Sequence, residues 1–114
     1  MIRLTLTITT SLGESQRLVE ALRSLMEPTR LDGGCTGCEL ALSAESDDPP
    51  HIRYVEDWSS EEELRTRVRS TRFLRLVAIM EEARSAPQLT FTLASGSRGL
   101  DYVAEVRRDL TGEV

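Results

Sequence analysis

The chain contains neither lysine nor asparagine, and each of its 14 basic residues is an arginine. The lack of lysine excludes catalysis through a Schiff base, which needs an amine. The lack of asparagine removes that residue from any substrate pocket. Histidine occurs once, as His51, next to a Pro-Pro turn. This position favours a surface histidine over a catalytic base.

Long hydrophobic runs are also missing. No apolar stretch approaches the roughly 18 residues that a transmembrane helix needs. The first ten residues alternate between apolar and polar and do not form the apolar block of a signal peptide. We therefore expect a cytoplasmic protein. The net charge of −5 argues against nucleic acid or an anionic membrane as a partner, because both repel an acidic surface.

Common catalytic motifs are absent as well. A phosphate-binding loop would follow a strand, whereas Gly33-Gly34 precedes one, and the sequence has no G-x-S-x-G, H-E-x-x-H or EF-hand spacing. Cys35 and Cys38 form a C-x-x-C pair, but they lie between a Gly-Gly turn and a strand and not at a helix N-terminus, where a redox pair belongs.

The two cysteines are not expected to pair or to bind metal. If both are extended, their side chains point to opposite faces, with Cα atoms about 10 Å apart. Zinc needs about four ligands, and His51 is the only other strong candidate. We expect ordinary buried or half-buried thiols, no metal site and no cofactor.

What is present is the pattern of one small α+β domain. Alternation predicts strands and helical spacing predicts helices, and 114 residues suit a single hydrophobic core. Strands are expected at 2–8, 38–42, 51–58 and 89–93, a helix at 11–27 ending before Pro28, a two-piece helix at 60–69 and 70–80, and a turn at 46–50. The βαββαβ order is that of the ferredoxin-like fold with an antiparallel sheet.

The chain is expected to divide into a domain at 1–94 and an arm at 95–114. Residues 95–99 form a turn-rich linker, and Leu100, Tyr102, Ala104 and Val106 alternate with less apolar residues. The alternation predicts an extra C-terminal strand, which would gain most by pairing with a free sheet edge. In a homodimer that edge could belong to the partner, and the helix-free face of the sheet also needs cover. We expect a homodimer.

The stretch from Tyr54 to Phe73 is the most informative. Tyr54, Glu56 and Trp58 fall on one side of a strand, so a carboxylate lies between two aromatic residues on an apolar face. A buried carboxylate is costly unless it is paired. Ser60 and Glu63 have the spacing of a capping box for the helix that follows, and Ser70 is a cap between its two pieces.

The same stretch resembles the antibiotic biosynthesis monooxygenase family. The resemblance rests on Glu56-x-Trp58, a Ser/Glu-rich helix start, Leu64, Arg67, Ser70 and Phe73, together with the Gly34-Cys35 step before the second strand. It implies a dimeric α+β barrel. In the resembling enzymes the tryptophan that matches Trp58 lines a cavity for a planar aromatic substrate. This chain carries Arg67 where the family usually has histidine.

Arg67 and Glu56 are best considered together. Arg67 flanks the buried side of its helix, and Glu56 on the neighbouring strand is a natural counter-charge, for which Arg72 competes. In one interpretation the pair joins helix to sheet. In the other, Arg67 binds an enolate, phenolate or carboxylate. Arginine cannot replace histidine as a proton carrier near neutral pH.

Two functions remain open. The first is a cofactor-independent monooxygenase that oxidises a phenol or hydroquinone, in a pocket formed by Trp58, Arg67, Tyr54, Glu56, Arg72 and Phe73. The second is a dimer that binds a small aromatic or hydrophobic molecule without turning it over. Trp58 and Tyr54 could instead pack in the hydrophobic core and take no part in binding a ligand.

Overall fold

The structure is a computed structural model that describes residues 1–43 and 49–111. The turn expected at 46–50 lies mostly outside this part, as does the end of the predicted arm. Within it the elements are β1 (Ile2–Thr9), α1 (Leu12–Arg30), β2 (Cys35–Ser43), β3 (His51–Trp58), α2 (Glu61–Arg69), α3 (Thr71–Glu82), β4 (Gln88–Leu93), β5 (Gly96–Arg98) and α4 (Leu100–Thr111).

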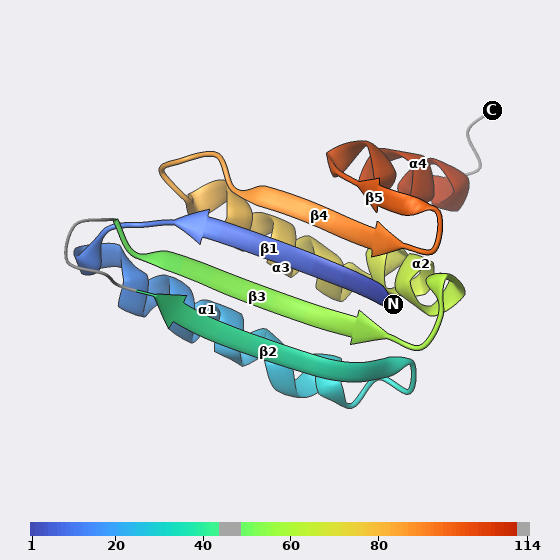
Figure 1. Ribbon diagram of the computed structural model, residues 1–114, viewed down its shortest axis with the longest axis horizontal. Coiled ribbons are helices and arrows are strands. Elements are labelled where there is room, and N and C mark those ends of the chain that lie inside the picture. The colour runs from blue at the N-terminus through green and yellow to red at the C-terminus, as the bar shows by residue number, and fades with distance from the viewer. Residues whose placement is uncertain (44–48, 112–114) are drawn as a thin grey trace.

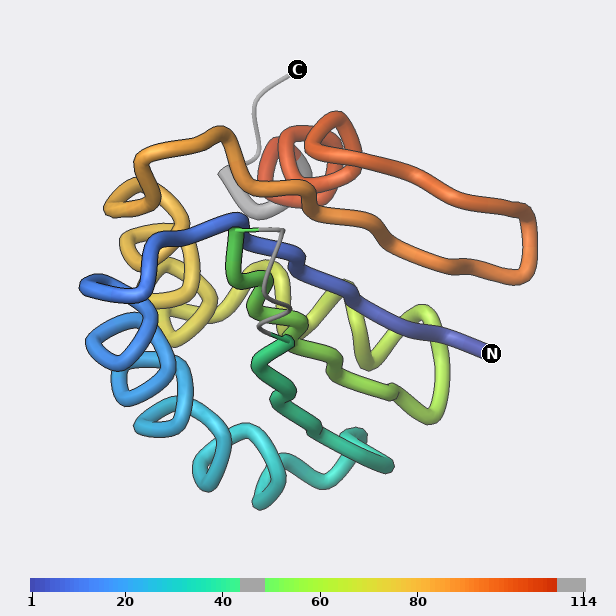
Figure 2. Tube along the Cα trace, turned by 60° about the vertical axis from the view of Figure 1, so that its left-hand side comes forward, coloured from blue at the N-terminus to red at the C-terminus, as the bar shows by residue number. Residues whose placement is uncertain are grey.

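The five strands form one antiparallel sheet in the order β2-β3-β1-β4-β5. Helices α1 and α3 lie side by side along one face of the sheet (Figures 1 and 2). The first four strands and three helices therefore have the predicted ferredoxin-like arrangement. The core lies between the sheet and these helices, where Leu4, Leu6 and Ile8 of β1 meet Leu18 and Leu22 of α1, all fully buried.

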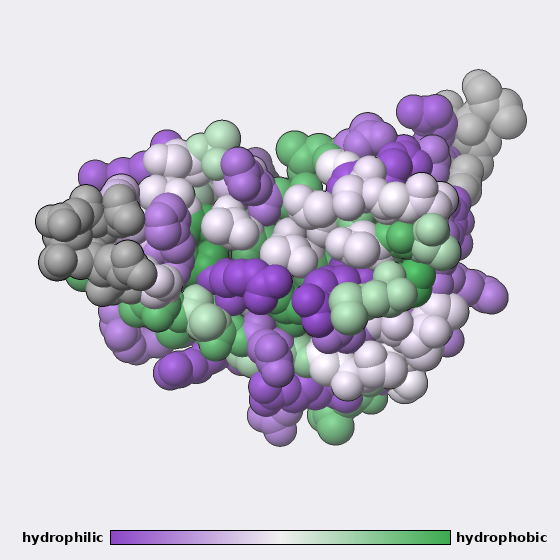
Figure 3. All heavy atoms as spheres, viewed as in Figure 1, coloured by the Kyte–Doolittle hydropathy of each residue, from purple (hydrophilic) through white to green (hydrophobic). Residues whose placement is uncertain are grey.

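The opposite face of the sheet carries no helix and is largely polar. In Figure 3 this face shows mostly hydrophilic and neutral side chains. Thr5, Thr7 and Thr9 of β1 are half-buried there. At one end of the face Arg3 donates to Asp57, with 2.6 Å between Arg3 Nε and Asp57 Oδ1.

Helix α1 continues through Pro28 instead of ending before it, contrary to the prediction. Proline lacks an N–H and so removes one hydrogen bond of the helix. Thr29 Oγ1 donates to the carbonyl of Leu25 over 2.7 Å, and the Leu31 N–H donates to the carbonyl of Glu27 over 3.1 Å. These bonds keep the final turn helical.

The C-terminal prediction is wrong in detail. A fifth strand exists, but it is Gly96–Arg98, in the expected linker, and residues Leu100–Thr111 form helix α4. Residues i and i+4 lie on the same side of both a strand and a helix, so this spacing does not distinguish the two. Here the residues with this spacing are Tyr102 and Val106, which are both buried. Leu100, which a strand would place beside them, is 61% exposed.

Helix α4 also packs within its own chain. It lies against α2 and β4, and Figure 1 shows it beside β5 at the end of the sheet. The Tyr102 ring packs on Phe91 with centroids 4.8 Å apart. The Arg107 side chain donates to the Val68 carbonyl over 2.8 Å. Within the described residues, the segment after β4 thus packs against the rest of the fold.

Candidate functional site

Strand β3 brings three candidate residues to the helix-covered face of the sheet. Its alternation points Tyr54, Glu56 and Trp58 toward α2, and their residues are 0%, 0% and 4% exposed. The neighbouring strands fix this register, because Glu56 pairs with Leu4 of β1 and Cys38 of β2. The predicted buried carboxylate is therefore present.

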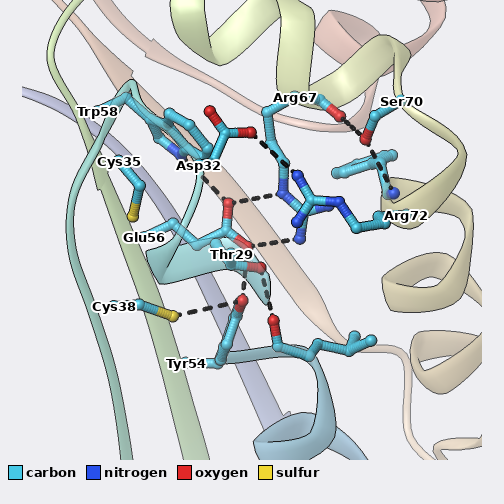
Figure 4. Close-up of polar contacts among 12 residues, drawn as sticks. Thr29, Asp32, Cys35, Cys38, Tyr54, Glu56, Trp58, Arg67, Ser70 and Arg72 are labelled. Carbon is cyan, nitrogen blue, oxygen red and sulfur yellow. Dashed lines mark hydrogen bonds and ion pairs between the residues drawn. The ribbon is translucent and has the colours of Figure 1, made fainter. Parts of the chain in front are cut away.

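The Glu56 carboxylate accepts four hydrogen bonds, which satisfy both of its oxygens. Oε1 accepts from Trp58 Nε1 at 3.1 Å and from Arg67 Nε at 3.1 Å. Oε2 accepts from the Tyr54 hydroxyl at 2.6 Å and from Arg67 Nη2 at 2.8 Å. Figure 4 shows these four side chains converging, and we call Tyr54, Glu56, Trp58 and Arg67 the Glu56 cluster.

Arg67 reaches the cluster from α2. Ser60 caps this helix by accepting from the Glu63 N–H over 3.2 Å, as predicted. Leu64 and Val68 fix its buried side, and Arg67 on the same side is only 1% exposed. Its guanidinium lies 5.8 Å from the centroid of the Phe73 ring. Burial acts to lower the pKa of Arg67, but the hydrogen bonds and the charge of Glu56 outweigh it and raise that pKa.

Tyr54 is held in the neutral form for a related reason. Burial, followed by the negative charge of Glu56, raises the pKa of the Tyr54 phenol well above its ordinary value. Together with the cationic Arg67, this leaves the Glu56 cluster with two donors that keep their protons throughout the neutral range.

Arg72 does not compete for Glu56. It extends from α3, and its Nη2 donates to Asp32 Oδ2 over 3.0 Å. Asp32 lies in the turn between α1 and β2, and its other oxygen accepts from the Gly34 N–H over 3.2 Å. Asp32 was not predicted as a site residue, because the sequence identifies it only as the first residue of a turn. In Figure 4 both guanidinium groups reach from the helices toward the sheet.

Two buried nitrogen atoms remain without an acceptor. Among the described residues, Arg67 Nη1 and Arg72 Nη1 are the buried side-chain polar atoms that make no hydrogen bond. Leaving a buried donor without a partner costs about 1–3 kcal/mol, and more for a charged group. Both atoms belong to candidate site residues that the structure places in one region.

The two cysteines differ from the prediction in orientation. A β-bulge between Cys35 and Gly37 inserts one extra residue, so Cys35 pairs with Trp58 and Cys38 with Glu56, two residues apart on β3. Both side chains therefore face the helices. The thiols are free, as expected. Cys38 Sγ donates to the Tyr54 hydroxyl over 3.6 Å, a contact that sequence reasoning missed.

The remaining candidates lie outside the Glu56 cluster. His51 is half-buried, and its Nδ1 lies 3.3 Å from Thr9 Oγ1. Tyr102 donates to Glu61 Oε2 over 3.0 Å, beside α2. The described residues include no group of three or more histidine, cysteine or acidic side chains placed to hold a metal ion.

Three surface hollows border the sheet and helix α1. One of about 590 Å³ is lined by Arg23, Arg30 and Arg53 among others. The second, of about 400 Å³, borders Cys35 and Cys38, and the third, of about 230 Å³, borders Thr9 and Arg84. No member of the Glu56 cluster lines any of the three.

The fold and the Glu56 cluster define an α+β protein of the ferredoxin-like class. Residues 1–79 match the antibiotic biosynthesis monooxygenase family. The chain belongs to this family, as the resemblance of its sequence indicated.

Solved structures share the fold at low identity. An antibiotic biosynthesis monooxygenase is 22% identical, with 82% of this chain and 98% of that one covered and a TM-score of 0.63. A conserved protein from Methanosarcina mazei is 20% identical, with 81% and 90% covered and a TM-score of 0.65. A conserved protein of unknown function from Bacteroides thetaiotaomicron is 19% identical, with 86% and 95% covered and a TM-score of 0.67.

No curated protein matches the chain. Among the described residues, no helix is both long enough and apolar enough to cross a lipid bilayer.

Proposed function

We propose that the chain binds a small aromatic molecule carrying an oxyanion, of the phenol or hydroquinone type, and oxidises it as a cofactor-independent monooxygenase. The observation that carries this proposal is the pair of buried guanidinium nitrogens, Arg67 Nη1 and Arg72 Nη1, that make no hydrogen bond within the described residues. An oxyanion supplies the acceptor that both atoms lack.

The surroundings suit such a ligand. Glu56 holds two nitrogens of Arg67, so the third has a fixed direction. Trp58 and Phe73 provide aromatic surface next to this guanidinium. Offset aromatic packing and the positive charge together favour a planar, negatively charged ring over a neutral aliphatic molecule.

Oxidation of the bound anion by dioxygen requires few further groups from the protein. A phenolate or hydroquinone anion supplies the electrons for its own reaction with dioxygen. The protein's part is to stabilise the anion and keep water away from it. Fixed guanidinium groups in a buried setting do this without reorganising during the reaction.

A second function, binding without turnover, is favoured by a specific observation. The pKa values of Arg67 and Tyr54 are both raised, so neither side chain exchanges a proton readily at neutral pH. A ligand whose oxidation needs proton transfer by the protein would be bound and left unchanged. Arg67 stands where the family usually has histidine, which is the residue for such a transfer.

Two measurements on one panel of hydroquinones separate these functions. Quenching of Trp58 fluorescence without oxygen measures binding, and Trp58 is the only tryptophan of the chain. Oxygen uptake in air measures turnover. Quenching with uptake supports the monooxygenase, and quenching without uptake selects the binding protein. No quenching by any member of the panel contradicts both.

Variants on α3 give the matched control. Arg72→Gln is expected to weaken quenching, because it removes one of the two free donors. Arg75→Gln, on the exposed side of the same helix, should leave it unchanged. A further variant, Arg67→His, tests turnover: a large gain in oxygen uptake would mean that only a proton carrier is missing.

We also propose that the protein is a homodimer. The helix-free face of the sheet carries half-buried threonines beside Arg3, Arg53 and Asp57, and a sheet with helices on one face can bury its other face against a partner. The resemblance to the family's dimeric barrels supports the same arrangement.

A further inference from the structure

The two arginines at the candidate site are held very differently. The Arg67–Glu56 pair has two direct bonds, and its side chains are 1% and 0% exposed. The Arg72–Asp32 pair has one bond, of 3.0 Å, and its side chains are 32% and 26% exposed. Breaking a buried pair leaves an uncompensated charge, whereas a partly exposed pair with a single contact contributes little. Arg67–Glu56 is therefore the fixed pair and Arg72–Asp32 the exchangeable one.

Arg72 and Asp32 are also more accessible to water than the Glu56 cluster. Each member of that cluster is less than 5% exposed, and Phe73 is fully buried. The side chains of Arg72 and Asp32, by contrast, are 32% and 26% exposed. A ligand arriving from solution meets this ion pair before it meets Arg67.

We propose that Asp32 occupies the anion position of this site, and that the oxyanion of a ligand enters by replacing the Asp32 carboxylate on Arg72. This inference rests on the proposed function for the nature of the ligand, and it adds a residue that determines specificity. A neutral ligand gains nothing at this position, with or without Asp32, because it cannot act as the counter-ion of Arg72.

The loop geometry suits such an exchange. Asp32 Oδ1 accepts from the Gly34 N–H, and the Asp32 carbonyl accepts from the Cys35 N–H over 3.0 Å. The Gly34 carbonyl accepts from the Ser59 N–H over 2.9 Å. A side chain at Gly34 would collide with Glu63, so the loop lies tightly against the start of α2. Asp32 can thus keep its bond to Gly34 and be hydrated after a ligand has taken its place on Arg72.

Arg72 gains from the exchange. Only its Nη2 contacts Asp32, and its Nη1 makes no bond within the described part of the chain. A carboxylate or phenolate bound at Arg72 can supply the acceptor that this nitrogen lacks. Bonds from charged donors to an oxyanion are roughly twice as strong as neutral ones.

The test uses benzoate and the neutral benzamide of the same shape, with binding measured by calorimetry. The variants are Asp32→Asn, which keeps an oxygen for Gly34, and the matched control Asp57→Asn. Asp57 pairs with Arg3 on the other face of the sheet at a similar exposure, 28% for Arg3 and 30% for Asp57. Asp32→Ser provides a second variant, in case asparagine impairs folding.

We expect Asp32→Asn to raise the affinity for benzoate about two- to fivefold, the range set by the loss of one partly exposed ion pair. Benzamide binding and the Asp57→Asn protein should show no such gain. An unchanged or lower benzoate affinity in both Asp32 variants, or an equal gain in Asp57→Asn, overturns the inference, and so does a lack of benzoate binding in every protein.

The outcome of this test can be distinguished from a failure of the proposed function. Benzoate is not a hydroquinone and reports only on the exchange of anions at Arg72. Wild-type binding and oxidation of hydroquinones are measured separately. If Asp32→Asn raises the affinity for benzoate but the wild type does not bind hydroquinones, the role of Asp32 is supported and the proposed substrate class is contradicted.

Discussion

Arg67 and Glu56 connect α2 to β3 through two hydrogen bonds, of 3.1 and 2.8 Å, made where neither side chain reaches water. The charges compensate each other, and Tyr54 and Trp58 complete the carboxylate's bonds. A buried pair of this kind adds little stability over an apolar one, but removing one partner is expensive. The pair therefore constrains which substitutions this site tolerates.

Arg67→Gln is expected to lower the free energy of unfolding by about 3–5 kcal/mol, because Glu56 would remain buried and charged. Adding Glu56→Gln should recover part of the loss, since two amides can bond without a net charge. Chemical denaturation measures both. The control is Arg72→Gln, whose partly exposed pair should be worth about 1 kcal/mol or less. Equal losses in Arg67→Gln and Arg72→Gln would show that the buried pair is not the main constraint.

Stability should fall at alkaline pH in part through Cys38. Burial raises the pKa of this thiol to about 11 from an ordinary value of 9.0, in spite of its bond to Tyr54. A group whose pKa is raised in the folded state stabilises the folded protein fully at pH values below the group's pKa in the unfolded chain. That contribution is lost as the unfolded chain ionises between pH 9 and pH 11.

The loss amounts to roughly 3 kcal/mol at most. Cys38→Ala lacks this contribution, so the stability advantage of the wild type over Cys38→Ala should shrink from neutral pH to pH 11. Denaturation curves at several pH values measure the difference. An advantage that stays constant with pH would mean that Cys38 ionises equally in both states.

Tyr102 is expected to anchor α4. It is 1% exposed and packs on Phe91, so Tyr102→Ala should cost about 3–5 kcal/mol. Tyr102→Phe keeps the ring, loses the hydroxyl's bond to Glu61 and should cost about 1 kcal/mol. Leu100→Ala should change little, because the helix leaves Leu100 exposed. Comparable losses at residues 100 and 102 would favour a strand over the helix.

The proposed dimer is tested on the helix-free face. Thr7 lies near the middle of β1 and is half-buried there, whereas Thr66 on α2 is exposed. Sedimentation should show a dimer for the wild type and for Thr66→Arg, and a shift toward monomer for Thr7→Arg. A monomeric wild type, or a dimer that tolerates Thr7→Arg, contradicts association through this face.

Much of the fold follows from local patterns in the sequence. The alternation in β1 and β3, the serine caps of α2 and α3, and the helical stripe at Leu64 and Val68 act over a few residues. They sufficed to predict the βαββαβ order and to place Glu56 opposite Arg67. That pair was predictable because the strand and the helix follow each other directly in the chain.

The features that sequence reasoning missed depend on long-range contacts or on local irregularity. Asp32 lies 40 positions from its partner Arg72, and a turn residue gives no sign of such a contact. The bulge before Cys38 changes the face of Cys35 without changing the alternation that follows. In the tail, the spacing of Tyr102 and Val106 fits both a strand and a helix. Only the packing of α4 on α2 decides for the helix.

The measurement that tests the account most directly compares 4-nitrophenolate with 4-nitroanisole by calorimetry, in the wild type and in Arg72→Gln. The two ligands have nearly the same shape, but only the first carries an oxyanion. We expect the wild type to bind the phenolate at least about tenfold more tightly, as charge-assisted bonds to two free nitrogens imply, and Arg72→Gln to lose most of this preference. Equal affinity for the two ligands in the wild type, or a preference that Arg72→Gln leaves intact, would contradict the proposal that these nitrogens receive the ligand's oxyanion.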